Sequence, residues 1–206
     1  MIRVHRIPFS TNVERVALAA GHKDIEVEWV DHDPADRSAL VELSGQELVP
    51  VAEIDGEVVV DSMRIVEALE ATEPEPALYP SELSDRARAD VFVEWFNFVW
   101  KVPPNELDDE LEKPDPDELA VGVLIARTRS WTPLFEAMLT GSPFLWGETF
   151  GAADICAFPF LKYAVLETTP NDFESFHHVL ERCLKPAGAY PLLCDWVARV
   201  DALPRA

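Results

Sequence analysis

Hydrophobic residues in the first 75 positions follow two different periods. Four short segments alternate apolar and polar residues or are rich in branched apolar residues, and they predict strands over 2–7, 25–30, 51–54 and 57–60. Three other segments repeat apolar residues every three or four positions, and they predict helices over 13–20, 34–44 and 62–71. The expected order is strand, helix, strand, helix, strand, strand, helix.

Local signals support these boundaries. The pair Asp55-Gly56 predicts a two-residue hairpin turn between the last two strands. Asn12 and Asp33 are typical helix N-caps, and Gly21 is a typical helix end. A strand–helix–strand unit implies a parallel pair with a right-handed crossover. We therefore expect a four-stranded mixed sheet with helices on its faces.

The pattern changes after position 72. Segment 72–80 holds three prolines and is typical of a linker. Beyond it only helical spacing occurs, and helices are expected over 85–101, 118–139, 151–165, 172–184 and 190–200.

Two features are expected to interrupt this helical part. Pro103-Pro104 should end the first helix, and the acidic segment 108–117 should be a surface loop. The predicted organisation is an α/β domain over 1–76, a linker over 77–84 and an all-helical domain over 85–206.

The charge balance excludes some partners. The chain has 38 acidic and 17 basic residues, a formal net charge of −21. Nucleic acids and anionic membranes need a basic face, so neither is expected as a partner. No apolar run approaches the roughly 20 residues of a membrane helix, and the first residues resemble a strand rather than a signal peptide, so a cytoplasmic location is expected. The acidic surface has two interpretations, ordinary solubility or adaptation to high salt.

Cysteine and histidine give no sign of a metal centre. The three cysteines, Cys156, Cys183 and Cys194, are irregularly spaced and odd in number, which fits neither a disulfide framework nor a zinc site. We interpret them as buried hydrophobic residues. The five histidines lack metal-ligand spacing, and the neighbours His177 and His178 are interpreted as surface residues. No metal is expected.

Three short stretches carry candidate chemistry. Val49-Pro50 precedes a buried strand and can form a cis turn, which leaves the Val49 backbone open to an extended, peptide-like ligand; the alternative is an ordinary turn. Asp61-Ser62 opens a helix, where free N–H groups bind a carboxylate and Asp61 can hold an ammonium group; the alternative is a simple N-cap by Ser62. The Ser10 hydroxyl follows the first strand and can lower the pKa of a ligand thiol.

Together these stretches resemble the cytosolic glutathione transferase superfamily. Its thioredoxin-like N-terminal domain has the same β-α-β-α-β-β-α order, a Val-Pro turn with a cis proline (here Val49-Pro50) and an acid-Ser pair that binds the γ-glutamyl group (here Asp61-Ser62). The resemblance extends through the linker and the helical domain. There the family's N-capping motif matches Gly151 to Asp154, with Gly151 in place of the usual Ser or Thr.

The resemblance also implies a catalytic residue. In the Ser and Cys classes it lies six residues before the Val of an Arg-Val pair, and Arg15-Val16 therefore indicates Ser10, as in a Ser- or Thr-type loop. Thr11 is close enough to substitute. Asn12 could share the role, or it could serve only as the N-cap. Val13 stands at the second redox position, so a dithiol mechanism is excluded.

Further binding residues follow from the same resemblance. Arg37 is a candidate for the glycyl carboxylate of glutathione. The electrophile pocket is expected from the first loop and the first helix of the helical domain. The aromatic candidates, each of which could instead be core, are Phe9, Trp95, Phe98 and Trp100.

The expected function is a glutathione-dependent transferase that acts on a small hydrophobic electrophile, with glutathione as cosubstrate and a homodimer as the assembly. Two alternatives stay open. One is a non-catalytic binding or regulatory protein of the same fold. The other is a glutathione-dependent dehalogenase, etherase or isomerase, although the Ser-Ser-Cys-Ser run of the isomerase class is absent.

Overall fold

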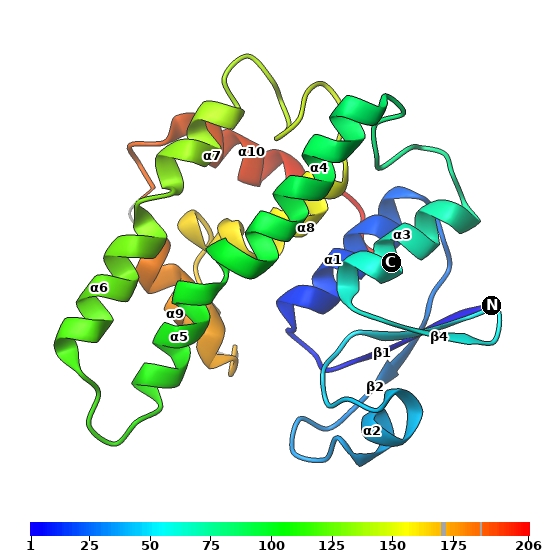
Figure 1. Ribbon diagram of the computed structural model, residues 1–206, viewed down its shortest axis with the longest axis horizontal. Helices are drawn as coiled ribbons and strands as arrows, with labels where there is room; N and C mark the ends of the chain where they lie inside the picture. Colours follow the sequence, from blue (N-terminus) through cyan, green and yellow to red (C-terminus); the bar gives the residue numbers. More distant parts are fainter. Residues whose placement is uncertain (170–171, 186) are drawn as a thin grey trace. The chain divides into compact units, whose positions relative to one another are not determined.

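The computed structural model describes residues 1–169, 172–185 and 187–206. The chain divides into two compact units (Figure 1). The first unit consists of Met1–Leu78 together with Leu203–Ala206, and the second consists of Tyr79–Ala202. Within the described part, no helix is long and apolar enough to cross a lipid bilayer.

A four-stranded mixed sheet forms the centre of the first unit. Its strands are β1 (Ile2–Arg6), β2 (Glu28–Asp31), β3 (Val51–Ile54) and β4 (Glu57–Val60), in the spatial order β2-β1-β3-β4. β1 is parallel to β2 and antiparallel to β3, and β3 is antiparallel to β4. The predicted sheet is confirmed. Positive φ angles of 52° at Asp55 and 91° at Gly56 close the β3–β4 hairpin, as the Asp-Gly pair predicts.

Three helices cover the two faces of this sheet. α1 (Thr11–His22) and α3 (Ser62–Thr72) lie side by side on one face, and α2 (Ser38–Ser44) lies on the other (Figure 1). Alternation along β1 points Val4, which is fully buried, to the α1/α3 face. α2 begins four residues later than predicted, because Asp33 bonds the N–H of Ala35 in a local turn instead of capping a helix.

A buried ion pair holds the far ends of α1 and α3 together. The ammonium group of Lys23 is fully buried and lies 2.5 Å from a carboxylate oxygen of Glu70. It also donates to the carbonyl oxygens of Glu73 at 2.6 Å and Pro76 at 2.9 Å. Glu70 in turn accepts from the N–H of Leu78. This cluster fastens the segment that leaves the unit, which contains a second cis peptide bond at Glu75-Pro76.

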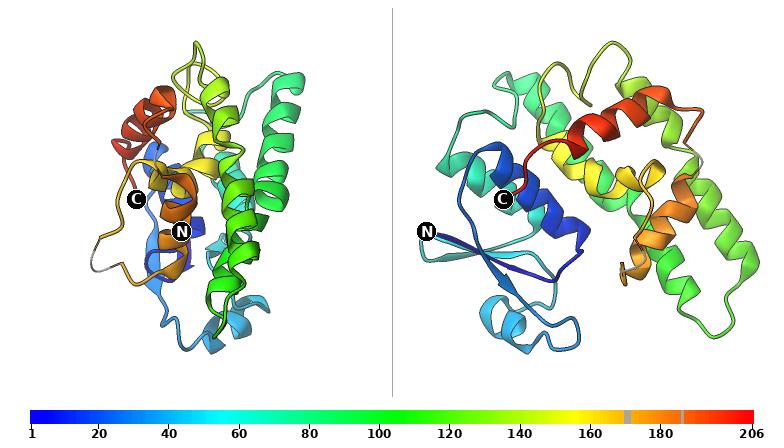
Figure 2. Two further views of the ribbon diagram at one scale, coloured as in Figure 1. Left: turned by 90° about the vertical axis from the view of Figure 1, so that its left-hand side faces the viewer. Right: turned by 180° about the vertical axis from the view of Figure 1, so that it is seen from behind.

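The last residues of the chain return to α1 (Figure 2). The N–H of Ala206 donates to the carbonyl of Ala17 at 3.1 Å, and Arg205 pairs with Glu14 at 3.2 Å. Gly21 does not end α1 as predicted, since the helix continues to His22. A Cβ at Gly21 would lie 2.5 Å from the carbonyl oxygen of Pro204, so this position needs glycine for the close approach.

The second unit is helical, as predicted. In its described residues the regular elements are α4 (Leu83–Trp95), a π-helical segment (Phe96–Trp100), α5 (Val102–Leu111), α6 (Glu118–Arg129), α7 (Thr132–Met138), α8 (Ala152–Leu161), a 3₁₀ turn (Lys162–Ala164), α9 (Ser175–Leu184) and α10 (Pro191–Asp201).

Two boundary predictions in this unit are wrong. Pro103-Pro104 starts a helix, because proline in the first turn loses no intrahelical hydrogen bond, and α5 therefore occupies part of the predicted loop 108–117. The single helix predicted over 118–139 is two helices, with the break at Ser130 and Trp131.

Aromatic rings fill the core of the second unit. Phe96 stacks on Trp100 with ring centroids 4.5 Å apart, and both contact Phe135 and Phe160. Trp100 is fully buried, so of the two interpretations open for it the structure favours a core residue. His177 is also buried rather than exposed: it bonds Asp172 at 2.7 Å and stacks on Tyr163.

Asp154 caps α8 from inside the core. One carboxylate oxygen accepts from the N–H of Gly151 at 3.0 Å, which is the predicted capping contact. The other accepts from the N–H of Leu145 at 3.0 Å and from the indole of Trp196 at 2.7 Å. Burial raises the pKa of Asp154 to about 6 despite these three donors.

The raised pKa of Asp154 predicts a pH-dependent stability. The folded state binds a proton at Asp154 that the unfolded state has released, so this contribution is complete below about pH 4 and is lost as the pH rises through about 6. The free energy of unfolding of the wild type, minus that of Asp154→Asn, should fall by roughly 2 kcal/mol between about pH 4.5 and 7.5. Urea titrations across this range measure the difference. A constant difference would contradict the assignment.

Candidate active site

Ser10 occupies the N-cap position of α1, with an extended backbone at φ −62° and ψ 122°. Its carbonyl accepts from the N–H of Glu14, but its side chain makes no cap hydrogen bond. Among the described residues, the Ser10 hydroxyl has no hydrogen-bond partner. The cap predicted at Asn12 is wrong, because Asn12 lies inside the first turn of α1. The Ser10 hydroxyl can therefore bond to a ligand at no cost to the helix.

The guanidinium group of Arg15 joins two of the predicted site residues. Arg15 is 1% exposed. Its Nη1 donates to Oδ1 of Asn12 at 3.2 Å and to Oγ of Ser62 at 3.1 Å. Asn12 on α1 and Ser62 on α3 are therefore held on the same nitrogen atom. The structure thus brings together residues that are 50 positions apart in the sequence.

Asp61, not Ser62, caps α3. Asp61 has φ 71°, and its Oδ1 accepts from the N–H groups of Met63 at 2.9 Å and Arg64 at 3.2 Å. The interpretation of Ser62 as a simple N-cap is wrong, since its buried hydroxyl oxygen accepts from Arg15. The Ser62 hydroxyl proton has no acceptor in the described part of the chain. The start of α3 therefore offers a carboxylate and a donating hydroxyl side by side.

The Val49-Pro50 peptide bond is cis, as the sequence suggested. Pro50 is buried, and β3 begins at the next residue. Neither the N–H nor the C=O of Val49 has a hydrogen-bond partner among residues 1–169, 172–185 and 187–206. This backbone can therefore pair with an extended ligand.

Arg37 fastens the two ends of α2. Its Nε donates to the carbonyl of Pro34 at 3.2 Å and its Nη1 to the carbonyl of Glu47 at 3.3 Å. The side chain is partly exposed, so it can also meet an anion.

The remaining candidates have different environments. In the first unit, Thr11 is buried at the start of α1, and Phe9 is 57% exposed with φ 70°. In the second unit, Trp95 contacts the rings of Trp131 and Phe135, and Phe98 is 70% exposed. No group of three or more metal-binding side chains occurs in the part of the chain that the structure describes.

Arg15 is the site residue whose role the sequence interpretation missed. In the sequence, Arg15 belongs to the Arg-Val pair that indicates Ser10. The available signal was the i,i+3 spacing of Asn12 and Arg15, which places both on one side of α1. Nothing in the sequence pattern indicated Ser62 as the second partner, because that contact depends on how α1 and α3 pack.

Comparisons with known proteins agree with this fold. A thioredoxin-like sheet domain followed by a helical domain defines the class. The model "Glutathione S-transferase, N-terminal domain" matches residues 4–77, and "Glutathione S-transferase, C-terminal domain" matches residues 101–204. The chain belongs to the glutathione S-transferase family.

Solved structures and a curated relative add detail. The chain is similar to a tau-class glutathione S-transferase of mango (TM-score 0.81, 18% identity, 98% of this chain and 89% of the other). It is also similar to the beta-etherase LigF of a Sphingobium strain (TM-score 0.77, 20% identity, 98% and 96%). A probable maleylacetoacetate isomerase of Caenorhabditis elegans is 37% identical over 76 residues, which are 36% of each chain. The chain thus matches about a third of the length of that curated relative.

The position of Arg15 predicts a large cost for its removal. Arg15→Met should lower the free energy of unfolding by about 2–4 kcal/mol, because it takes the donor Nη1 from the buried hydroxyl of Ser62 and from the partly buried amide oxygen of Asn12. Arg64→Met is the matched control: it removes an exposed arginine of α3 and should cost at most about 1 kcal/mol. Urea unfolding measures both, and equal costs would contradict the role of Arg15.

Proposed function

We propose that this protein is a glutathione-dependent transferase that activates the glutathione thiol for attack on a small hydrophobic electrophile. The observation that carries the proposal is the Ser10 hydroxyl at the start of α1, which caps nothing in the described chain. Solved relatives of the same fold are described with glutathione bound, one from Xanthomonas axonopodis and one from Methylobacillus flagellatus.

The catalytic role falls to Ser10. Its hydroxyl donates to the ligand sulfur and favours the thiolate, and the N-terminal end of the α1 dipole acts in the same direction. The thiolate attacks the electrophilic carbon, the new carbon–sulfur bond forms, and the electrophile's leaving group departs with its electron pair. Asn12 is the second candidate for the sulfur, although Arg15 already occupies its Oδ1.

The rest of the tripeptide is bound by the polar groups of the first unit. The Val49 backbone pairs with the ligand as a short strand. Asp61 holds the ammonium group of the γ-glutamyl end, and Ser62 donates its free hydroxyl proton to the carboxylate. Arg37 is the candidate for the glycyl carboxylate. Phe9, Trp95 and Phe98 are the candidates for contact with the electrophile.

Isomerisation is the second candidate reaction. The curated relative is named as an isomerase, and its similarity spans 76 residues at 37% identity. In this reaction the same thiolate adds to a double bond and leaves again after rotation, so the chain's residues keep their roles. Product analysis with an unsaturated diacid and with an aryl halide separates the two reactions. The beta-etherase among the structural relatives makes ether cleavage a third reaction to assay.

The family resemblance also predicts a homodimer. Exposed apolar side chains on α4 support the proposal, since Leu83 is 85% and Val91 is 68% exposed in the single chain. The protein's mass in solution, by sedimentation equilibrium, tests it.

Ser10→Ala tests the catalytic role. The pKa of bound glutathione thiol should rise by about one to two units, and kcat/KM near neutral pH should fall about 10- to 100-fold. Ultraviolet absorbance of the thiolate and initial rates measure these effects. Stability should change by less than about 0.5 kcal/mol, whereas loss of a working N-cap costs about 1 kcal/mol. Full activity in Ser10→Ala, together with a loss in Asn12→Ala, would transfer the role to Asn12.

Asp61→Asn tests the head-group site. Asparagine caps a helix as well as aspartate and tolerates positive φ, so the fold should be kept while the negative charge is lost. Retention on immobilised glutathione should weaken at least about tenfold, since a charged hydrogen bond is worth about 1.5–3 kcal/mol. Asp36→Asn is the matched control, because Asp36 bonds the start of α2 in a similar way.

Ser62→Ala should also lose retention. A wild-type protein that is not retained would overturn glutathione binding. Retention without turnover of any electrophile would favour the non-catalytic alternative.

A further inference from the structure

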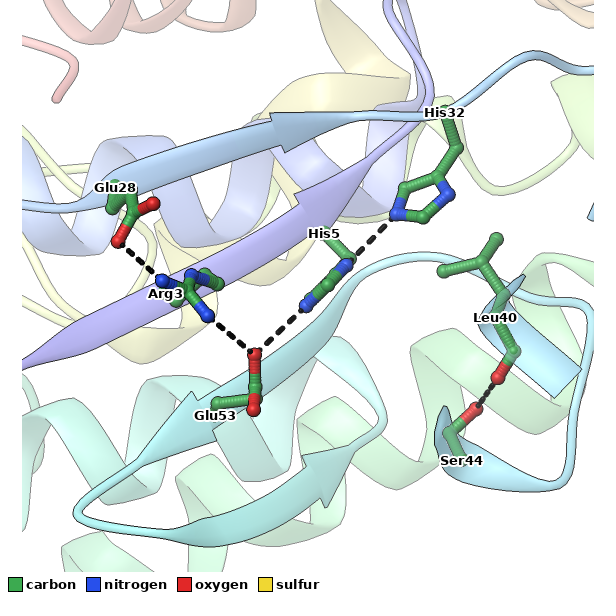
Figure 3. Close-up of polar contacts among 7 residues, drawn as sticks. All are labelled: Arg3, His5, Glu28, His32, Leu40, Ser44 and Glu53. Atoms are coloured by element: carbon green, nitrogen blue, oxygen red, sulfur yellow. Dashed lines mark hydrogen bonds and ion pairs between the residues drawn. The ribbon is translucent and has the colours of Figure 1, made fainter. Parts of the chain in front are cut away.

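A chain of polar contacts crosses the α2 face of the sheet (Figure 3). Nδ1 of His5 lies 2.8 Å from Nε2 of His32, and Nε2 of His5 lies 3.1 Å from Oε1 of Glu53. Arg3 extends the chain, with one nitrogen 3.4 Å from Glu53 and another 3.1 Å from Glu28. The five residues come from β1, β3, β2 and the position that follows β2. None of them has a role in the proposed active site.

The contact between the two histidines sets a limit on their protonation. A hydrogen bond of 2.8 Å between two ring nitrogens needs one proton, carried by either nitrogen. The neutral pair meets this condition if His32 donates to His5 and His5 donates to Glu53. One added proton also fits, because the pair then shares a positive charge beside the Glu53 carboxylate. A second added proton sets two N–H groups against each other and breaks the bond.

The surroundings lower the pKa at which His32 takes up this second proton. Burial lowers the pKa of His32 from its ordinary value of 6.5, and the charge of His5 lowers it further, while Asp31 acts in the opposite direction. The hydrogen bond from His5 lowers the pKa of Glu53, with smaller help from Arg3, so the carboxylate stays ionised.

Charged groups from three strands flank the pair in the described part of the chain. From β1 and β3 they are Arg3 and Glu53, and from β2 they are Glu28 and Asp31, the last of which is itself paired with Arg6 at 2.6 Å. The residues of α2 drawn beside the pair, Leu40 and Ser44, carry no charge (Figure 3).

His32 is the point at which the loop between β2 and α2 leaves the sheet. Its N–H donates to the carbonyl of Arg6 at 2.8 Å, and its ring is held by His5. The next anchor that reaches out of the loop is Arg37, which bonds the carbonyl of Glu47 beyond α2. The bonds of Asp33 and Asp36 stay inside the loop and the first turn of α2. Loss of the His5–His32 bond therefore removes the side-chain anchor at one end of segment 33–37, which then depends on the backbone bond to Arg6.

We propose that Glu53, His5 and His32 form a proton-controlled latch, which holds the loop 33–37 on the sheet while the histidine pair carries at most one added proton and releases it when a second proton binds. The latch goes beyond the proposed transferase function and is measured without any ligand, so its test is independent of glutathione binding. If Arg37 binds the ligand as proposed above, release of the loop also weakens that contact at low pH.

The sign and size of the effect follow from linkage. The second proton binds more weakly in the latched state than in the released state. The latch therefore stabilises the loop fully when the pH is above the ordinary pKa of histidine. This stabilisation is lost as the pH falls through the lowered pKa of His32. Because release is coupled to one proton, protection of the loop amides should fall by at most about tenfold for each pH unit, from roughly 6.5 down to the lowered pKa of His32, and level off below it.

Hydrogen exchange followed by NMR tests the latch. Exchange rates of the hydrogen-bonded amides of His32, Ala35 and Asp36, corrected for intrinsic pH dependence, are compared between about pH 7.5 and 5 with those of β3. We expect the loop amides to lose protection as the pH falls, and the amides of β3 to keep theirs. The ring nitrogens of His32 are followed in the same samples, and this ring should become protonated over the pH range in which the loop loses protection.

Two variants complete the test. His32→Gln keeps a polar side chain that does not titrate, so its loop protection should not depend on pH. His22→Gln removes another histidine with a lowered pKa, at the end of α1, and should behave like the wild type. The proposal is overturned if loop protection in the wild type stays constant while the His32 ring becomes protonated. It is equally overturned if His32→Gln keeps the wild-type pH dependence, or if β3 loses protection together with the loop.

Discussion

The geometry of the candidate site depends on one buried cation. A guanidinium group that is 1% exposed cannot keep its water, so its donors must meet protein acceptors. Arg15 meets this requirement with oxygen atoms of Asn12 and Ser62. A rotation or shift of α1 against α3 would leave part of the charge without a partner. The beginnings of the two helices, and the residues that flank them, are held in one arrangement for this reason.

A second buried cation lies at the opposite ends of the same two helices. The Lys23 ammonium group is fully buried and meets Glu70 and two carbonyl oxygens near the linker. Buried polar contacts therefore lie at both ends of the α1–α3 pair, with apolar side chains such as Val16 and Ile65 between them. Apolar packing alone tolerates small shifts, whereas a buried charge does not. This arrangement leaves Ser10 and Asp61 free to present polar groups away from the core.

Pattern and turn chemistry predicted most of the fold, since strand alternation and the Asp-Gly turn are local properties. The errors have local causes too. Pro103-Pro104 was interpreted as a helix end, but the same residues are favourable in a first turn, and only the following residues decide between the two. The sequence indicated Ser62 as the possible cap of α3, but Asp61 caps it. The positive φ at Asp61 brings its own carboxylate to the N–H groups, and this angle depends on how β4 leads into α3. The contact of Arg15 with Ser62 depends on how α1 packs against α3, so it cannot be predicted from the sequence of either segment alone.

Strand β1 explains why two unrelated polar systems can coexist in so small a unit. Its residues alternate between the faces of the sheet, so Val4 packs toward α1 and α3 while Arg3 and His5 point to the α2 side. The Arg15 contacts lie in the α1/α3 layer, and the histidine chain lies across the sheet from it. Both act on segments that follow strands of this sheet, the α3 start after β4 and the α2 loop after β2. In the proposed latch, a second proton on the histidine pair therefore loosens the α2 loop on one face without disturbing the buried cation that sets the position of Ser62.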